Sequence, residues 1–197
     1  MKVAGIILAA GGSTRMGGQN KLLQMVDGIS LVQRVVRSAL NSNIESVYVI
    51  LGYQAALIRQ CISNKSVNWV ENSDWSRGMA SSIKSGIEAL NTDYDGAMIL
   101  LGDMPFIEPI TINQLLALYQ KKKIVVPVKN GRQGNPVLFS SAFFADLKLL
   151  GRDKGAKPII KKNPDSVIIA NVLTDTIFHD LDTPDQIKER IGASRII

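Results

Sequence analysis

Short apolar segments alternate along the chain with longer segments in which apolar residues recur every three or four positions. The short segments are rich in β-branched residues, which is typical of buried strands. The longer segments have the spacing of helices that cover one face of a sheet. This alternation predicts βαβ units, a mostly parallel central sheet and therefore an α/β fold. The predicted strands are residues 3–8, 47–51, 67–70, 97–101, 124–128, 137–139 and 167–172.

Helical spacing and end signals place the helices between these strands. The predicted helices are residues 31–40, 55–62, a helix that Gly78 opens, 111–119 with Thr111 as N-cap, and 140–150. In the helix after Gly78, apolar residues fall on one face, which indicates core packing. Residues 129–133 are predicted to form a polar loop, and a final helix is expected to begin with Thr183 as N-cap and Pro184 at its first position.

Length and composition indicate one globular domain. The chain has 197 residues, of which 46% are hydrophobic and 20% charged, and we expect a single domain over residues 1–197. No apolar stretch is long enough to span a bilayer, and the N-terminal residues lack the order of regions that marks a signal peptide. Cys61 is the only cysteine, which excludes an intrachain disulfide and fits a cytoplasmic protein.

The net charge of +6 is compatible with several anionic partners, namely nucleic acid, membrane surfaces or small molecules. The densest basic cluster is Lys121, Lys122 and Lys123. We interpret it as a solvated group at a helix end, because no aromatic residues alternate with the lysines as a base-stacking surface requires. We therefore expect small-molecule substrates, and neither a nucleic acid nor a membrane as partner.

The segment LAAGGSTRMGGQNK, residues 8–21, follows the first predicted strand and is rich in glycine. Gly11 and Gly12 permit backbone conformations that other residues avoid, and Arg15 and Lys21 add two cations. Exposed N–H groups and fixed cations suit a polyanion such as a triphosphate. The spacing matches neither the P-loop nor the dinucleotide fingerprint. A purely conformational turn therefore stays open as the alternative interpretation.

Asp103 stands at the carboxyl end of a predicted central strand, in the sequence Gly-Asp-Met-Pro. Ligands of open α/β sheets bind at this edge. If this strand neighbours the first one, the carboxylate faces the glycine-rich loop, and Mg²⁺ would join it to bound phosphates, because Mg²⁺ needs only one or two protein carboxylates. Asp182 is the candidate second carboxylate, although Asp-Thr-Pro is also an ordinary helix start. Cys61 and His179 have no visible partner for nucleophilic catalysis, and we interpret both as structural.

Taken together, these motifs resemble the MobA-like nucleotidyltransferases, and the resemblance runs from end to end. Within that group the chain is most similar to the molybdenum cofactor cytidylyltransferases. The motifs are LAAGGSTRMG at 8–17 with Lys21, GMASSI at 78–83 with Gly86, GDMP at 102–105, GNPVLF at 134–139, DKGA at 153–156 and DLDTP at 180–184.

The resemblance implies a Rossmann-like three-layer fold with a mostly parallel, mixed central sheet. It also implies an Mg²⁺-dependent reaction in which the terminal phosphate of molybdopterin-type molybdenum cofactor attacks the α-phosphorus of CTP and releases pyrophosphate. Arg15, Lys21 and Asp103 would be the catalytic residues, and Asp103 and Asp182 the metal ligands. A transient contact with a molybdoenzyme that receives the product is a further expectation.

The resemblance also assigns the binding residues of the two substrates. The nucleotide would contact Leu8, Ala9, Ala10, Gly11, Gly12, Ser13, Arg15, Lys21, Ser81, Ser82 and Gly86. The acceptor would contact Gly134, Asn135, Pro136, Lys154 and Lys157. Ala10 stands where the guanylyl enzymes tend to have a second glycine, which favours CTP over GTP.

Departures from the family pattern leave alternatives open. Lys157 replaces a common arginine, and lysine lacks the bidentate fork of a guanidinium, so the acceptor is less constrained than the nucleotide. The alternatives are a guanylyltransferase for the same cofactor, a nucleotidyltransferase for a sugar phosphate or another phosphorylated small molecule, and a non-catalytic chaperone that binds and delivers the cofactor.

Overall fold

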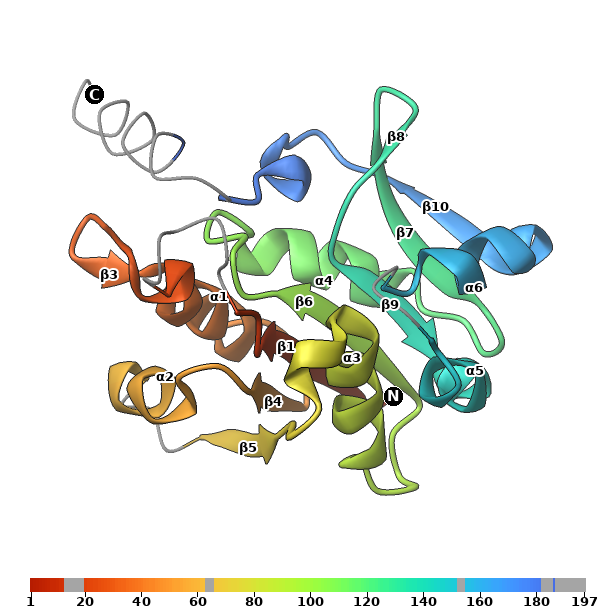
Figure 1. The fold of residues 1–197 in the computed structure, drawn as a ribbon. Helices are drawn as coiled ribbons and strands as arrows, with labels where there is room; N and C mark the ends of the chain where they lie inside the picture. The colour runs from red at the N-terminus through yellow and green to blue at the C-terminus, as the bar shows by residue number, and fades with distance from the viewer. Residues whose placement is uncertain (13–19, 63–65, 152–154, 182–185, 187–197) are drawn as a thin grey trace.

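A computed structural model describes residues 1–12, 20–62, 66–151, 155–181 and 186 (Figure 1). In this part of the chain, eight strands form a central sheet in the order β10-β7-β9-β6-β1-β4-β5, and β8 pairs with β7. A separate hairpin consists of β2 and β3. The strands are β1 (Val3–Ala9), β2 (Met25–Val26), β3 (Ile29–Ser30), β4 (Ser46–Leu51), β5 (Val67–Glu71), β6 (Gly96–Leu101), β7 (Ile124–Lys129), β8 (Arg132–Gln133), β9 (Val137–Ser140) and β10 (Val167–Asn171).

The central sheet is mixed and mostly parallel, as predicted. β1 pairs in parallel with β4 and β6, β4 with β5, and β7 with β10. β9 runs antiparallel to both β6 and β7. The chain builds outward from β1 through β4 to β5 and then returns to the other side of β1 with β6. β1 and β6 therefore flank a reversal of strand order, which is the place where open α/β sheets form a ligand crevice.

Helices cover both faces of the sheet and complete three layers (Figure 1). One core cluster joins β1 residue Ile7 to apolar residues of α1, α2 and α4, and the other joins Ile6 to residues of α3, α5 and α6. Neighbouring strand residues point to opposite faces, so Ile6 and Ile7 serve different cores. The helices are α1 (Leu31–Leu40), α2 (Ala55–Cys61), α3 (Met79–Glu88), α4 (Pro109–Ala117), α5 (Phe144–Lys148) and α6 (Lys157–Lys162), with 3-10 helices η2 (Lys21–Leu23), η3 (Trp75–Arg77), η4 (Ser141–Phe143), η5 (Pro164–Ser166) and η6 (Thr176–Phe178).

The predicted strands are all present, but some helix ends differ from the prediction. The prediction of Thr111 as N-cap is wrong, because Pro109 starts α4 after the extended residue Glu108 and Thr111 lies buried inside the helix. The lysines 121–123 also lie beyond α4, whose last turn holds no basic residue. A helix over 140–150 is only partly correct, since Ser140 ends β9 and caps η4. The β2–β3 hairpin and β8 were not predicted, and Thr183 and Pro184 lie outside the described residues.

Within the described ranges, no helix combines the length and the apolar character needed to cross a bilayer.

A tyrosine pair at the amino-terminal side of the sheet gives the fold an alkaline limit. The hydroxyl oxygens of Tyr48 and Tyr94 lie 3.2 Å apart, and burial, then the hydrogen bond and charge of Tyr94, raise the pKa of Tyr48 to about 12. The folded-state pKa lies above the ordinary tyrosine pKa of 10.0, so this group stabilises the fold below pH 10 and loses that contribution as the pH rises toward 12. Urea unfolding measured between pH 9 and 11 should show that the free energy of unfolding falls more steeply with pH in wild type than in Tyr48→Phe. Equal slopes of this free energy against pH would contradict the role of Tyr48.

Candidate active site

The carboxyl ends of the parallel strands bring four loops to one edge of the sheet. Hydrogen bonds tie these loops to their neighbours. The N–H of Gly102 donates to the carbonyl of Leu8 at 3.1 Å, that of Tyr53 to Ala10 at 3.2 Å, and that of Asn72 to Leu51 at 2.9 Å. Residues that follow β1, β4, β5 and β6 therefore form one continuous rim, as the prediction of Asp103 facing the glycine-rich loop requires.

Lys21 and Asp103 meet at this rim although 82 positions separate them in the sequence. Lys21 Nζ lies 2.5 Å from Asp103 Oδ2, and the side chains are only 18% and 17% exposed. Asn20, which is buried, fixes the start of η2 because its Oδ1 accepts the N–H of Leu22 at 3.1 Å. The amine is thus held against the carboxylate by the cap of its own short helix.

The second oxygen of Asp103 is the unusual feature of the site. Asp103 Oδ1 is buried, and among the residues that the structure describes it has no hydrogen-bond partner. Buried carboxylate oxygens normally accept a hydrogen bond. A hard cation such as Mg²⁺, which takes oxygen ligands, would give this oxygen a partner. The described residues contain no group of three or more His, Cys, Asp or Glu side chains placed to hold a metal ion together. Asp103 therefore fits a site in which substrate phosphates and water supply most of the ligands.

The segment just before Asp182, the second predicted metal ligand, lies against the backbone of Asp103. The N–H of Leu181 donates to the backbone carbonyl of Asp103 at 3.0 Å, and Leu181 is buried. Asp182 is the next residue in the sequence but lies outside the described residues, as do Ser13, Arg15 and Lys154.

The described part of the glycine-rich loop shows two different surroundings. Leu8 and Ala9 belong to β1 and pack into opposite cores, while Ala10 is buried just beyond the strand. A Cβ added to Gly11 would meet no atom within 4 Å, whereas one added to Gly12 would lie 3.0 Å from Cζ3 of Trp75. Among the described residues, Gly11 thus has no neighbour at the position of a side chain, whereas Gly12 faces an aromatic ring.

Two of the three predicted nucleotide contacts on α3 form part of a hydrogen-bond network around Asn72. Asn72 Nδ2 lies 2.9 Å from Ser81 Oγ and 3.1 Å from Ser82 Oγ. Gly78, with φ of +95°, precedes the helix and adopts a conformation that favours glycine. The network joins the end of β5 to the first turn of α3 and holds both serines in place.

Gly86 lies in the core rather than at the rim. A Cβ on Gly86 would lie 2.6 Å from Ile6 Cγ2, so the residue is glycine because α3 approaches β1 closely. Ser82 is likewise buried, while Ser81 is half-buried and reaches a surface cavity.

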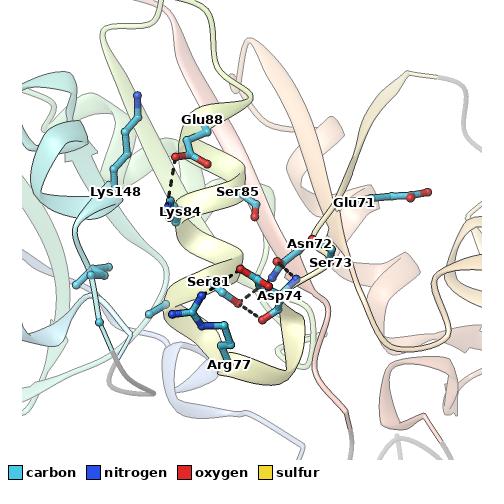
Figure 2. Close-up of a pocket in the computed structure, with 13 residues that line it drawn as sticks. Glu71, Asn72, Ser73, Asp74, Arg77, Ser81, Lys84, Ser85, Glu88 and Lys148 are labelled. Atoms are coloured by element: carbon cyan, nitrogen blue, oxygen red, sulfur yellow. Dashed lines mark hydrogen bonds and ion pairs between the residues drawn. The ribbon is translucent and has the colours of Figure 1, made fainter.

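That cavity has a volume of about 300 Å³ and runs along the outer side of α3 (Figure 2). Its charged walls are largely paired, with Arg77 and Asp74 at 3.3 Å and Lys84 and Glu88 at 3.9 Å, and Lys148 of α5 lines it as well. Neither Lys21 nor Asp103 lines it. The cavity is therefore a polar surface hollow beside α3, distinct from the Lys21–Asp103 pair.

The predicted acceptor residues Gly134, Asn135 and Pro136 reach the same edge of the sheet from the opposite chain direction. They precede β9, and because β9 is antiparallel to β6, its start lies at the carboxyl edge of β6. The N–H of Asn135 donates to the carbonyl of Ile177 at 3.0 Å. Lys157 begins α6 and is exposed.

Asn72 and Trp75 were not predicted from the sequence as parts of the site. Asn72 follows β5 directly, as Ala10 follows β1 and Gly102 follows β6. A polar residue immediately after a predicted parallel strand was the signal that could have identified Asn72, since such residues gather at one edge of the sheet.

Known proteins are similar to this chain in sequence and in fold. The family model described as "MobA-like NTP transferase domain" matches residues 5–167. "Nicotine blue oxidoreductase" from Paenarthrobacter nicotinovorans is 26% identical over 192 residues, which cover 93% of this chain and 94% of that protein. "Bifunctional protein GlmU" from Coxiella burnetii (strain Dugway 5J108-111) is 34% identical over 117 residues, 59% of this chain but only 25% of that protein.

Among solved structures, the Mycobacterium sp. strain JC1 homologue of Mycobacterium tuberculosis Rv0371c superposes with a TM-score of 0.90 at 26% identity and full coverage of both chains. A manganese complex of Rv0371c itself has a TM-score of 0.85 at 22% identity and covers 98% of this chain and 100% of that one. These likenesses extend over the whole sheet and its helices.

Proposed function

Because the chain belongs to the MobA-like NTP transferase family, we propose that it transfers CMP from CTP to the terminal phosphate of a molybdopterin-type molybdenum cofactor. A terminal phosphate oxygen of the cofactor forms a bond to the α-phosphorus of CTP. The bond from that phosphorus to the β-phosphate oxygen breaks, and pyrophosphate leaves. The observation that carries the proposal is the half-buried Asp103 carboxylate, which contacts Lys21 through Oδ2 and whose buried Oδ1 has no hydrogen-bond partner among the described residues.

The chain's own residues supply charge and position, which are the main demands of such a transfer. Lys21 is placed to exchange its contact with Asp103 for a phosphate oxygen when the triphosphate enters. Arg15, in the same loop, is proposed as a second cation for the triphosphate. Mg²⁺, held by Asp103 and by Asp182 as second carboxylate, would neutralise phosphate charge and orient the reacting groups.

We place the nucleoside of CTP beside the end of β1. Ala10 is 2% exposed, and its Cβ lies 2.8 Å from the position that a Cβ on Gly52 would take. The methyl group therefore fills space between two loops of the rim. We propose that the Ala10 methyl group narrows the space for the base and so favours the smaller cytosine ring over guanine.

The acceptor is proposed to bind on the other side of Asp103, against Gly134, Asn135 and Pro136. Lys154 and Lys157 are the proposed partners of its phosphate. The product would pass to a molybdoenzyme, and we propose a cytoplasmic location, in which Cys61 stays reduced.

Pyrophosphate release tests this proposal directly. Purified protein with Mg²⁺ and molybdopterin cofactor is expected to release pyrophosphate from CTP and to use ATP, GTP and UTP poorly. Ala10→Gly should shift the ratio of kcat/KM for CTP to that for GTP toward GTP by about tenfold, because removal of one buried methyl group changes discrimination by about 1–3 kcal/mol. GTP used while CTP is inert would overturn the nucleotide assignment. Turnover with a sugar phosphate in place of the cofactor would overturn the acceptor, and cofactor binding without turnover would favour a delivery chaperone.

A further inference from the structure

Trp75 opens η3, between the end of β5 and the start of α3, and its backbone is fixed on both sides. Asn72, which is 4% exposed, accepts the N–H of Asp74 with its Oδ1 at 3.0 Å. The carbonyl of Trp75 accepts the N–H of Gly78 at 3.1 Å. The network that holds Ser81 and Ser82 therefore also sets the place of Trp75.

The indole of Trp75 bridges two loops of the rim. A Cβ on Gly52 would lie 2.5 Å from Trp75 Cβ and 2.7 Å from Cγ, so the near end of the side chain rests directly on the loop after β4. A Cβ on Gly12 would lie 3.0 Å from Cζ3, on the six-membered ring. The ring of Tyr53 packs beside the indole with 5.5 Å between centroids. The far end of the indole thus meets the glycine-rich loop at Gly12.

Within residues 8–12, the described start of the loop, the indole lies against Gly12 and not against Gly11. No described residue lies within 4 Å of the position that a side chain on Gly11 would take, while Gly12 lies against the indole. Trp75 as a whole is half-buried. A rigid aromatic ring therefore limits how far Gly12 can move toward β5.

We propose that Trp75 is a positioning residue that holds Gly12, directly after β1, in the place from which its backbone contacts a bound nucleoside triphosphate. The inference rests on the proposed function, because it takes Gly12 to border the bound nucleotide. Trp75→Phe keeps an aromatic ring against Gly52 but removes the ring that reaches Gly12. Gly12→Ala instead forces the loop away from an intact indole.

A double-mutant cycle of these two substitutions tests the contact itself. The dissociation constant of CTP with Mg²⁺ is measured by equilibrium dialysis and the set is repeated with GTP. Each single variant is expected to raise the CTP dissociation constant about tenfold, and the double variant little more than either single one, because directly contacting residues are not additive. Trp69→Phe is the matched control. Trp69 lies in β5 under the guanidinium of Arg59, 5.4 Å away, and its loss should change the constant by less than about twofold.

Fluorescence provides a second readout that leaves Trp75 unchanged. The chain has two tryptophans, so in Trp69→Phe all tryptophan emission comes from Trp75. We expect CTP to change this emission with the dissociation constant found by dialysis, even if Trp75→Phe does not fold. Three results would each overturn the role of Trp75 and leave the proposed function standing. They are wild-type affinity for CTP in Trp75→Phe, additive effects of the two substitutions in the cycle, and unchanged emission on CTP binding. A folded wild-type protein that binds no nucleoside triphosphate would overturn the proposed function together with the role of Trp75.

Discussion

Asp103→Asn is expected to lower the rate of nucleotidyl transfer by about a hundredfold to a thousandfold, the range found when one preorganised electrostatic group is removed. Asparagine keeps the shape of the side chain but loses the negative charge. Asp103 Oδ1 has no partner among the described residues, so the charge is the property that a bound cation would use. The measurement is pyrophosphate release at saturating CTP and cofactor, combined with calorimetric titration of Mg²⁺.

Asp95→Asn is the matched control, because Asp95 stands before β6 and Asp103 after it. The carboxylate of Asp95 accepts the N–H of Lys2 at 2.8 Å, at the opposite edge of the sheet. We expect wild-type turnover in Asp95→Asn and similar thermal midpoints for both variants. An Asp103→Asn protein with the turnover of this control would contradict a catalytic role for the Asp103 charge.

Much of the fold could be predicted from the sequence because the spacing of apolar residues distinguishes strands from helices. Apolar runs such as residues 97–101 are buried on both faces, as central parallel strands require. The direction of β9 could not be read in this way. A strand of four residues has the same period in either direction, and its antiparallel pairing with β6 and β7 depends on where the following helices pack.

The site was only partly predictable, for a related reason. Asp103 could be placed opposite the glycine-rich loop because each follows a predicted strand, β6 and β1, and the two strands could be expected to be neighbours. The approach of Trp75 to Gly12 could not, since it depends on the shape of a turn rather than on a period. By contrast, the burial of Ser82 and Gly86 could have been predicted from the sequence. They adjoin Ile83 and Ile87, which face the core, and residues four apart share one helix face.

The two sides of the rim depend on different kinds of interaction. On the side of β5, neutral hydrogen bonds of Asn72 and the aromatic contact of Trp75 fix the loops. On the side of β6, a mostly buried ion pair between Lys21 and Asp103 does so. An ion pair at a binding site can be exchanged for substrate charges without leaving either group unpaired, so the β6 side is the one suited to respond to an arriving metal–nucleotide complex.

Lys21→Met should therefore change two properties in opposite directions. Turnover is expected to fall by about a hundredfold, because a cation aimed at the phosphates is lost. Binding of Mg²⁺ without nucleotide is expected to become about tenfold tighter, because Lys21 Nζ, 2.5 Å from Asp103 Oδ2, no longer competes for the carboxylate. Methionine keeps most of the apolar stem, so packing changes little. Calorimetry with Mg²⁺ alone and pyrophosphate release with both substrates measure the two effects separately.

Lys84→Met controls for the loss of one positive charge, because Lys84 pairs with Glu88 on the exposed side of α3 at 3.9 Å. This control should leave both turnover and Mg²⁺ affinity unchanged. A fall in Mg²⁺ affinity alongside the fall in turnover of Lys21→Met would mean that Lys21 supports the metal site rather than competing with it. In that case the lysine would orient the Asp103 carboxylate for the cation, and exchange of the ion pair on nucleotide binding would be excluded as the role of this contact.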